Sequence, residues 1–501
     1  MERNRARATD DNPYLSIGVR PFINCCGVRT VHGGSVMLPE VKRAMDAASH
    51  HFVNLDELME CVGRRLAELT GAAWAIVTSG ASAALCHATA ACVAGADPEK
   101  MLRLPDTRGL KNRVLMTKHG RFTYDHAIRM VGVEVLEVET WGQLSESLDE
   151  RVAMIAVLGT KAGEGEFRVE RLADLAGPRG VPIVVDAASE HLKRPDPYLT
   201  RGATMVAYSG GKYLRGPQCT GLLLGEEAWV RAAWMNSAPH HAFGRAMKVG
   251  KEEIIGLLAA VEYWAVARHD AIERRQWEAD LAEIAREVTR VPSVATEIRE
   301  AKGPAEPAPR LWISWDARQI GWTGLDLRAR LLEEEPRIML DDRGATDNSL
   351  AILPNSLQPG EAKVVGIRLR EALATAPTAS REARPPAELP QVDGCWDVQV
   401  QYIKGSSSQQ LELTQRDHEL TGVHRTPLFE NALAGRLAGH EITFSSLHPF
   451  EGTNLAYRFT GNVRGEFMEG TVEVGSSGET APGPLNQREY GTARWHAKRR
   501  G

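Results

Sequence analysis

Two short segments decide how this chain folds: residues 184–188, VVDAA, and residues 207–212, AYSGGK. The first is typical of a buried parallel strand that ends in the carboxylate of Asp186. The second is typical of the next strand, which ends in a tight glycine turn that presents Lys212. Because active groups in open α/β sheets gather at the carboxyl ends of strands, we expect these two side chains, 26 residues apart, to face one cavity.

The residues around these segments follow an α/β pattern. From about residue 40, short apolar runs alternate with helical patterns, which is typical of a largely parallel sheet. A long helical stretch from about 252 to 288 mixes charged and apolar residues and is expected to cross between two lobes. The expected helices are 39–48 and 55–69, and the expected strands are 75–78, 114–117, 133–138, 152–158, 183–185, 205–207 and 221–224.

The composition changes near residue 374, which predicts a division into domains. A polar stretch rich in Pro and Ala, ATAPTASREARPPAELPQ, is typical of a linker. Short alternating strands with regularly spaced turn residues follow it and predict an antiparallel β-barrel. The expected domains are an N-terminal extension 1–20, a large domain 21–290, a small α/β domain 291–373 that also takes up part of the N-terminal segment, a linker 374–392 and a barrel domain 393–499.

Six segments are expected to form strands of the barrel: WDVQVQY, QLELTQ, HELTGVH, EITFSSL, LAYRFTG and FMEGTVEVG. We interpret TGVHRT, AGRLAG, TGNVRG and EGTVEVG as containing turns, and the final HAKRRG as a short tail. The barrel sequence shows no catalytic constellation. A lipocalin-like small barrel fits it, and the fold alone does not reveal a role.

Bulk properties narrow the function classes. The net charge of −5 does not indicate a nucleic-acid-binding protein. The seven cysteines are scattered without a CxxC pair, so we expect neither a metal site nor a disulfide framework, and a reducing cytoplasm fits better. Residues 72–96 are almost uncharged but contain Ser, Thr, Gly and His, so we interpret them as strand, turn and helix rather than as a membrane span.

A lysine and a carboxylate at neighbouring strand ends are the groups that pyridoxal 5′-phosphate (PLP) chemistry requires. A lysine amine forms the Schiff base with the cofactor aldehyde, and partial desolvation keeps that amine neutral and reactive. A carboxylate keeps the pyridine nitrogen protonated, so that the ring accepts electrons from the substrate Cα. We assign Lys212 to the first role and Asp186 to the second. Taken singly, each has an ordinary alternative, an exposed turn lysine and a strand-end cap.

A turn of small residues, TSGAS at 78–82, predicts a phosphate site. Small residues let backbone N–H groups approach an anion, and the N-terminus of the following helix favours its negative charge. Ser79 and Ser82 add hydroxyl donors, and Ser209 is a further candidate. Such turns commonly only cap helices, so the pattern gains weight from Asp186 and Lys212.

Five stretches together resemble a known family: INCCGVRTVHGGS, TSGASAAL, VVDAAS, YSGGKYLRGPQCTGLLLG and GRAMKVGKEEIIGLL. They are similar to the selenocysteine-synthase-like branch of fold-type I PLP-dependent enzymes. That branch includes seryl-tRNA selenium transferases and D-glucosaminate-6-phosphate ammonia-lyase-like proteins. The resemblance covers roughly residues 15–370, its most specific part is SGGK…GPQ…G, and the barrel lies outside it.

The resemblance implies a role for individual residues. Residues 21–290 would form the PLP-binding domain, and a homodimer or a multiple of one would build the site. Asn24 and Arg29 could reach the substrate, and Gln218 and Thr220 lie in a turn that would approach a neighbouring subunit's cofactor. The implied assignments are Lys212 for the Schiff base; Asp186 for the pyridine nitrogen; Ser79, Gly80, Ala81 and Ser82 for the phosphate; His119 for stacking on the ring or catalysis; and Arg215, Arg245 and Lys248 for anionic groups of the substrate.

Among the reactions of this branch, we favour α,β-elimination on a hydroxylated amino acid or amino-sugar acid, as in an ammonia lyase or dehydratase. A tRNA-reading enzyme should carry a basic docking domain, and only about 20 residues precede INCCGVRT in a chain of negative net charge. We therefore expect an anionic, amino-acid-like substrate and neither a nucleic-acid nor a membrane partner. The alternatives are an aminotransferase, a racemase, a selenium-transferase-like enzyme, and a non-catalytic protein that binds a ligand through the barrel.

Overall fold

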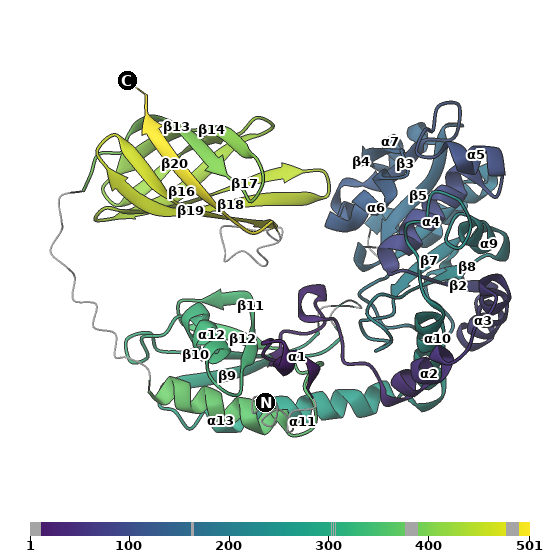
Figure 1. The fold of residues 1–501 in the computed structure, drawn as a ribbon, viewed down its shortest axis with the longest axis horizontal. Coiled ribbons are helices and arrows are strands. Elements are labelled where there is room, and N and C mark those ends of the chain that lie inside the picture. Colours follow the sequence, from purple (N-terminus) through teal and green to yellow (C-terminus); the bar gives the residue numbers. More distant parts are fainter. Residues whose placement is uncertain are drawn as a thin grey trace, which may run out of the picture. The chain divides into compact units, whose positions relative to one another are not determined.

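The computed structural model describes residues 12–161, 165–301, 303, 305, 307–375, 389–476 and 490–500 (Figure 1). The chain forms two compact units, residues 1–379 and residues 380–501. Most of the predicted linker 374–392 and of the predicted N-terminal extension lies outside the described residues. No helix in the described part of the chain is long and apolar enough to cross a membrane.

A seven-stranded sheet forms the centre of the first unit and confirms the predicted α/β class. The strand order is β2-β8-β7-β6-β5-β3-β4, and every neighbouring pair is parallel except those of β8, which runs antiparallel to β2 and β7. The strands are β2 (Trp74–Thr78), β3 (Arg113–Thr117), β4 (Glu134–Val138), β5 (Val152–Leu158), β6 (Ile183–Asp186), β7 (Met205–Ser209) and β8 (Gly221–Gly225).

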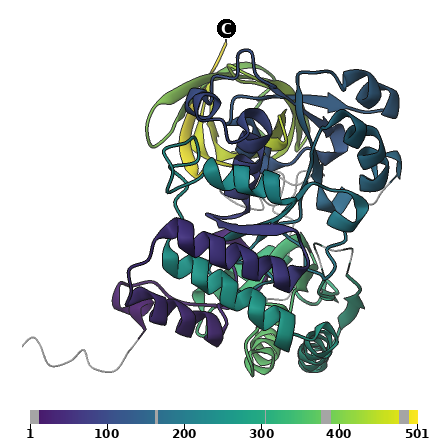
Figure 2. The ribbon, with the colours of Figure 1, turned by 90° about the vertical axis from the view of Figure 1, so that its right-hand side faces the viewer.

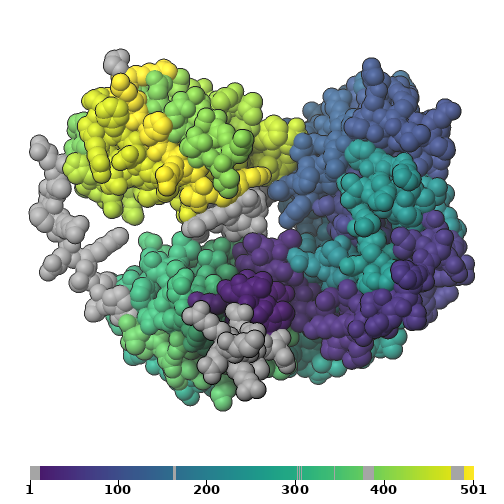
Figure 3. Space-filling view, viewed as in Figure 1, coloured from purple at the N-terminus to yellow at the C-terminus, as the bar shows by residue number. Residues whose placement is uncertain are grey.

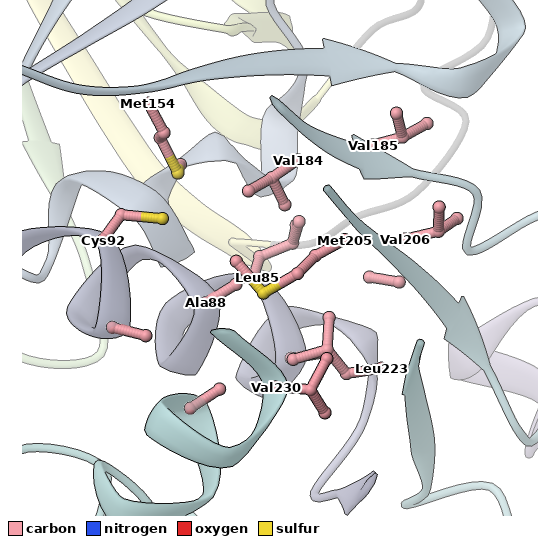
Figure 4. Close-up of a cluster of buried hydrophobic side chains, with 14 of the residues drawn as sticks. Leu85, Ala88, Cys92, Met154, Val184, Val185, Met205, Val206, Leu223 and Val230 are labelled. Carbon is pink, nitrogen blue, oxygen red and sulfur yellow. The ribbon is translucent and has the colours of Figure 1, made fainter. Parts of the chain in front are cut away.

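Helix α4 (Ala81–Ala94) packs against this sheet and is buried along almost its whole length. Its sequence, ASAALCHATAACVA, contains no Asp, Glu, Lys or Arg, and its alanines let the helix approach the strands closely. Figure 4 shows Leu85 and Ala88 of this helix beside Met205 of β7, and Cys92 beside Met154 of β5. This packing of α4 on the sheet fixes the position of the helix N-terminus. The turn 79–82, which precedes the helix, is therefore held at one edge of the sheet.

Further helices cover the large sheet. Helix α10 lies beside α2 and α3, as both ribbon views show (Figures 1 and 2). These helices are α2 (Pro39–Ser49), α3 (Leu55–Thr70), α5 (Pro98–Arg103), α6 (His126–Arg129), α7 (Trp141–Ser147), α8 (Val169–Ala176), α9 (Glu227–Met235) and α10 (Lys251–Ala267).

A second, five-stranded sheet forms the small lobe of the same unit, in the order β1-β11-β12-β10-β9. The N-terminal segment supplies β1, which pairs in parallel with β11, and Figure 3 shows this purple segment against the green small lobe. Three helices enclose the core of this lobe. The elements are α1 (Pro13–Ser16), β1 (Ile23–Cys25), α11 (Asp270–Val288), β9 (Val294–Arg299), β10 (Arg310–Trp315), α12 (Gly324–Glu333), β11 (Ile338–Thr346), β12 (Ser349–Ile352) and α13 (Glu361–Ala374). The domain bounds proposed from the sequence stay a prediction.

The single long helix expected over 252–288 is wrong. Helix α10 ends at Ala267 and α11 begins at Asp270, because Arg268 and His269 have extended backbone angles. The side chain of Arg268 turns inward, where Nη1 donates to the carbonyl of Tyr213 at 2.7 Å and Nη2 donates to Glu273 at 2.7 Å. The helical stretch is therefore interrupted at Arg268, whose buried guanidinium lines a cavity beside Lys212.

The second unit contains a closed barrel of eight antiparallel strands, as the predicted class requires. Most buried residues of the barrel strands are apolar and alternate with exposed residues, which is the pattern of a barrel filled by side chains. Four buried residues in the described part of the barrel are polar: Gln409, His424, Ser446 and His448. The strands are β13 (Gly394–Gln401), β14 (Ser406–Arg416), β15 (Glu419–Arg425), β16 (Glu430–Ala438), β17 (Glu441–Phe450), β18 (Thr453–Arg464), β19 (Phe467–Ser476) and β20 (Thr492–Arg499).

Several expectations for the turns and the C-terminal tail of the barrel are wrong. AGRLAG lies largely in β16, and most of HAKRRG belongs to β20 rather than to a tail. Gly435, Gly461 and Gly470 lie inside strands. Glycine is required there, because a Cβ on any of them would come within 2.3 Å of a neighbouring strand's backbone. Glycine marks close strand approach at these positions, not chain reversal.

Candidate functional site

Asp186 and Lys212 come from neighbouring parallel strands, β6 and β7. Asp186 is the last residue of β6 and is buried, and Lys212 lies three residues past the end of β7 and is partly buried. Burial raises the pKa of Asp186. Two effects partly offset this rise: the Ala188 N–H donates a hydrogen bond to Oδ1 at 2.8 Å, and the charge of Lys212 favours the carboxylate. Burial also lowers the pKa of Lys212, against the charge of Asp186. The two groups therefore interact at one edge of the sheet.

The glycines of the lysine turn are required by close backbone packing. A Cβ on Gly210 would lie 2.1 Å from Oγ1 of Thr220, and a Cβ on Gly211 would lie 2.3 Å from Cα of Gln218. The amide of Gly210 donates to the carbonyl of Thr220 at 2.8 Å. Packing of the SGGK turn onto the GPQCT segment thus fixes where the Lys212 main chain lies.

The turn 79–82 has the geometry of an anion site at a helix N-terminus. Gly80 has φ of 87°, and as the N-cap residue of α4 it makes no side-chain hydrogen bond to the first N–H groups of the helix. A Cβ on Gly221 would lie 2.4 Å from the carbonyl carbon of Gly80 and 2.6 Å from the amide of Ala81. Ser79, Gly80 and Ala81 are half-buried and Ser82 is exposed. The first residue of β8 thus packs closely against this turn, which can bind a phosphate.

Three further predicted cofactor residues lie around this edge. Ser209 is the last residue of β7 and pairs with Gly221 of β8. Thr220 is fully buried, and its hydroxyl donates to the carbonyl of Pro217 at 2.7 Å. His119 lies in a short turn after β3 and is exposed. Ser209 thus ends β7, Thr220 directly precedes β8 and His119 follows β3, and the structure shows no contact between His119 and Lys212.

A cavity of about 460 Å³ opens beside Lys212 between the large and small lobes, and we call it the Lys212 cavity. Arg215 lies in its wall with φ of 55°, a left-handed conformation that costs energy in a side-chain-bearing residue. Its Nε donates to the carbonyl of Val36 at 3.1 Å, and its other nitrogens have no hydrogen-bond partner among the described residues. The charge of Arg215 contributes to a lowered pKa of the exposed Glu40. The wall consists of Val28, Ser35, Val36, Lys212, Tyr213, Arg215, Arg268, Glu273, Gln276, Trp277, Asp280, Asn355, Ser356, Leu357, Gln358 and Pro359.

Sequence reasoning missed several polar groups of this wall. Both amide atoms of Asn355 and the hydroxyl of Ser356 are buried without a hydrogen-bond partner among the described residues. Asp280 and the buried cation Arg268 also line the cavity. The only sequence signal was the polar pair that follows the apolar run of β12, and such pairs are common in loops.

Other predicted substrate residues are not brought to this cavity. Arg245 and Lys248 are exposed in the loop between α9 and α10, outside the cavity wall. Arg29 forms ion pairs with Asp341 and Asp342. Asn24 donates to the carbonyl of Gly27 at 3.0 Å. Gln218, which was predicted to approach a neighbouring subunit's cofactor rather than the substrate, donates to the carbonyl of Thr30 at 3.0 Å. In this chain alone, Arg215 is the predicted substrate residue that reaches the Lys212 cavity.

The large sheet has seven strands, is mostly parallel, and carries a carboxylate and a lysine on neighbouring strands. A glycine turn at a helix N-terminus lies beside them. This combination is typical of the fold-type I PLP-dependent enzymes. This chain has that fold, it is a PLP-dependent enzyme, and it is related to the ammonia lyases and selenium transferases of that class. Asp186, whose Oδ2 has no hydrogen-bond partner among the described residues, and the turn at Gly80 fit the cofactor.

Particular relatives support this assignment. The chain is 28% identical over 371 residues to the D-glucosaminate-6-phosphate ammonia lyase of Salmonella typhimurium (strain 14028s / SGSC 2262), covering 72% of this chain and 97% of that protein. It is 28% identical over 388 residues to the 5'-C-glycyluridine monooxygenase-decarboxylase of a Streptomyces species, covering 74% and 95%. It is 25% identical over 287 residues to the L-seryl-tRNA(Sec) selenium transferase of Moorella thermoacetica, covering 50% and 57%.

A solved structure agrees with the sequence relatives. The structure of D-glucosaminate-6-phosphate ammonia-lyase matches with a TM-score of 0.66 at 27% identity, covering 74% of this chain and 100% of that one. No family model matches the chain.

Proposed function

We propose that this chain is a lyase that catalyses α,β-elimination on a hydroxylated amino acid or amino-sugar acid and releases ammonia and a 2-oxo acid. Loss of water across Cα and Cβ, followed by addition of one water at the Cα=N bond, leaves the net loss of ammonia alone. The observation that carries the proposal is the Lys212 cavity, where a desolvated lysine shares a wall with the unpaired guanidinium of Arg215.

Bound PLP supplies an electron sink for the negative charge that develops at the substrate Cα. We propose that Lys212 holds the cofactor as a Schiff base and that Asp186 pairs with the pyridine nitrogen. The phosphate would lie on the turn 79–82, and His119 would cover the ring. Ser209 and Thr220 complete the proposed cofactor site.

The environment of Lys212 suits proton transfer. Burial lowers the pKa of its amine, so a larger fraction is neutral near pH 7 and able to accept the Cα proton. The charge of Asp186 opposes this shift and keeps the ammonium form accessible, which lets Lys212 return a proton later in the cycle. Arg215 would bind an anionic group of the substrate, because its free guanidinium nitrogens offer parallel N–H donors.

We also propose a cytoplasmic homodimer. Apolar side chains near the N-terminus of the described chain are strongly exposed: Ile17 at 75%, Val31 at 65% and Phe52 at 103%. Exposed apolar side chains of this size favour a protein interface. In such a dimer, Arg245 and Lys248 of one subunit could contact the substrate in the other subunit's site, which they do not reach within their own subunit.

A second candidate reaction is oxygen-dependent decarboxylation of an amino acid. The relative named 5'-C-glycyluridine monooxygenase-decarboxylase is as similar to this chain as the ammonia lyase is, and both are covered almost completely. The first steps at the substrate Cα could share Lys212 and Asp186. The two reactions differ in their need for oxygen and in their gaseous product.

Ammonia release tests the proposal directly. Purified enzyme with PLP would receive D-glucosaminate-6-phosphate, D-glucosaminate or serine under nitrogen, without an added amine acceptor. We expect equal amounts of ammonia and 2-oxo acid from at least one hydroxylated substrate and none with Lys212→Ala. Turnover only in a parallel reaction in air, with oxygen uptake and CO₂ release, or turnover only with an added oxo acid, would refute elimination and favour a decarboxylase or an aminotransferase.

A further inference from the structure

Glu190 is a buried carboxyl group that the proposed chemistry does not use. It follows Asp186 in the same connection after β6, is 7% exposed, and its Oε1 is buried without a hydrogen-bond partner among the described residues. Oε1 fills the space beside Gly159, where an added Cβ would lie 2.2 Å from it. No cation lies within salt-bridge distance of Glu190 in the described part of the chain. A charged carboxylate is strongly disfavoured here, because neither water nor a cation balances it.

The hydrogen bonds of Tyr198 indicate that Glu190 carries a proton. The hydroxyl of Tyr198 lies 2.7 Å from Oε2 of Glu190 and 3.1 Å from the carbonyl oxygen of Gly159. A hydroxyl has one proton to donate, and a carbonyl has none. Both hydrogen bonds therefore form at once only when Glu190 supplies the second proton. Oε2 of Glu190 then donates to Tyr198, and Tyr198 donates to Gly159.

Two other buried acids lie near Glu190, and both are better placed to hold a negative charge. Asp196 accepts two hydrogen bonds from backbone N–H groups and a third from the hydroxyl of Tyr208, at 2.6 Å. Asp186 has a backbone donor and the charge of Lys212. Burial raises the pKa of Glu190 to about 7, and the charges of Asp186 and Asp196 add to this rise. The proton is therefore held by the carboxyl group that has the fewest donors.

The charged groups on the other side of Glu190 do not replace this proton. Glu190 and Tyr198 line a second cavity, of about 480 Å³. The other titratable residues in its wall are His191, Lys193, Arg201, Asp270 and Arg274. Both arginines are paired with glutamates, at 3.2 Å for Arg201 and 2.8 Å for Arg274, and burial lowers the pKa of His191 to about 4, so this ring is uncharged near pH 7. The hydrogen bond to Tyr198 and the charge of the exposed Lys193 lower the pKa of Glu190, but less than burial raises it.

We propose that Glu190 is a positioning residue of the cofactor site that keeps its proton at neutral pH, so that Asp186 holds the single carboxylate charge beside the pyridine nitrogen. The proposal rests on the proposed function for the role of Asp186, and it adds a second carboxyl group whose ionisation adjusts the site. Loss of the proton leaves the Tyr198 hydroxyl with two acceptors and places another negative charge near Asp186. That charge stabilises cations close to it, including the protonated form of the lysine-bound cofactor.

The test follows the proton and the cofactor separately in the full-length holoenzyme. Infrared absorption detects the carbonyl stretch of a protonated carboxylic acid, and visible absorption detects protonation of the lysine-bound cofactor. Glu190→Gln removes the titrating group with little change of shape, and Lys193→Met removes an exposed cation that favours its ionisation. Glu283→Gln is the control, because Glu283 lies outside both cavity walls and pairs with Arg286 at 3.5 Å.

We expect wild type to show a carboxylic acid band at about pH 6 that is lost by about pH 8 and is missing in Glu190→Gln. The midpoint of this loss should be higher in Lys193→Met, by ~0.3 pH units or more, and the same in Glu283→Gln. The midpoint of the visible titration should be lower in Glu190→Gln than in wild type, because the additional negative charge cannot form.

A wild type without a Glu190 band at pH 6 would overturn the proposal, as would equal visible midpoints in wild type and Glu190→Gln. If Glu190→Gln does not fold, Lys193→Met decides alone, and an unmoved infrared midpoint in that variant overturns the proposal. Failure of the proposed function is distinguishable, because it appears as a missing visible band or as a visible band without ammonia release, whereas the infrared band of Glu190 depends on neither.

Discussion

Arg215 offers a test in which stability and substrate binding should separate. Its left-handed φ of 55° costs about 1 kcal/mol, which glycine would not pay. Arg215→Gly also loses the hydrogen bond from Nε to the carbonyl of Val36, a loss of about 1 kcal/mol. These terms offset one another, so we expect the melting temperature to change by no more than about 3 °C. Loss of the free guanidinium should raise KM for an anionic substrate by about 10- to 100-fold, which corresponds to about 1.5–3 kcal/mol.

Ser293→Gly is the matched control, since Ser293 also has a positive φ, 67°, and lies outside the cavity wall. It should keep KM unchanged and leave stability equal or higher. Calorimetry of both variants, together with ammonia release at varied substrate concentration, checks the pair of expectations. A normal KM in Arg215→Gly would remove Arg215 from its proposed role, and a fall of more than about 10 °C in melting temperature would show that the residue is structural.

Three further changes probe other parts of the account. Gly221→Ala places a Cβ 2.4 Å from the backbone of Gly80, so cofactor retention after dialysis should fall at least ~10-fold while the fold survives. Asp186→Asn should keep the visible cofactor band and reduce ammonia release by ~10² or more, the scale of one catalytic electrostatic group. In the barrel, burial lowers the pKa of His424 to about 3, so its neutral form stabilises the fold above pH 6.5. That stability is lost as pH falls below 6.5, by about 3 kcal/mol at pH 4, and calorimetry should show His424→Gln losing less on acidification than wild type.

The core of the site could be predicted because its signals are local. Apolar runs that end in Asp186 and in the turn before Lys212 report buried strands directly, and the small residues at 79–82 report a backbone anion site. Neighbouring parallel strands then bring the two charged groups to one edge without further information.

The rest depends on contacts between distant residues. The break between α10 and α11 is caused by Arg268 turning toward Tyr213, which the helical pattern of 252–288 does not show. Asn355 and Asp280 join Lys212 only because the small lobe folds back over the large one. In the barrel, glycine is required at position 461 because the next strand and Trp495 approach closely, and Cζ2 of Trp495 would lie 2.8 Å from an added Cβ. From the sequence alone, such a glycine is interpreted as part of a turn.

The attachment point of the cofactor tests the central claim most directly. Purified protein with PLP would be reduced with borohydride, digested and analysed by mass spectrometry. The account predicts that reduction abolishes the visible band, that the cofactor is found on the peptide containing Lys212, and that Lys212→Ala never acquires the band. Cofactor attached to another lysine, or a wild type that gains no band with added PLP, would contradict it.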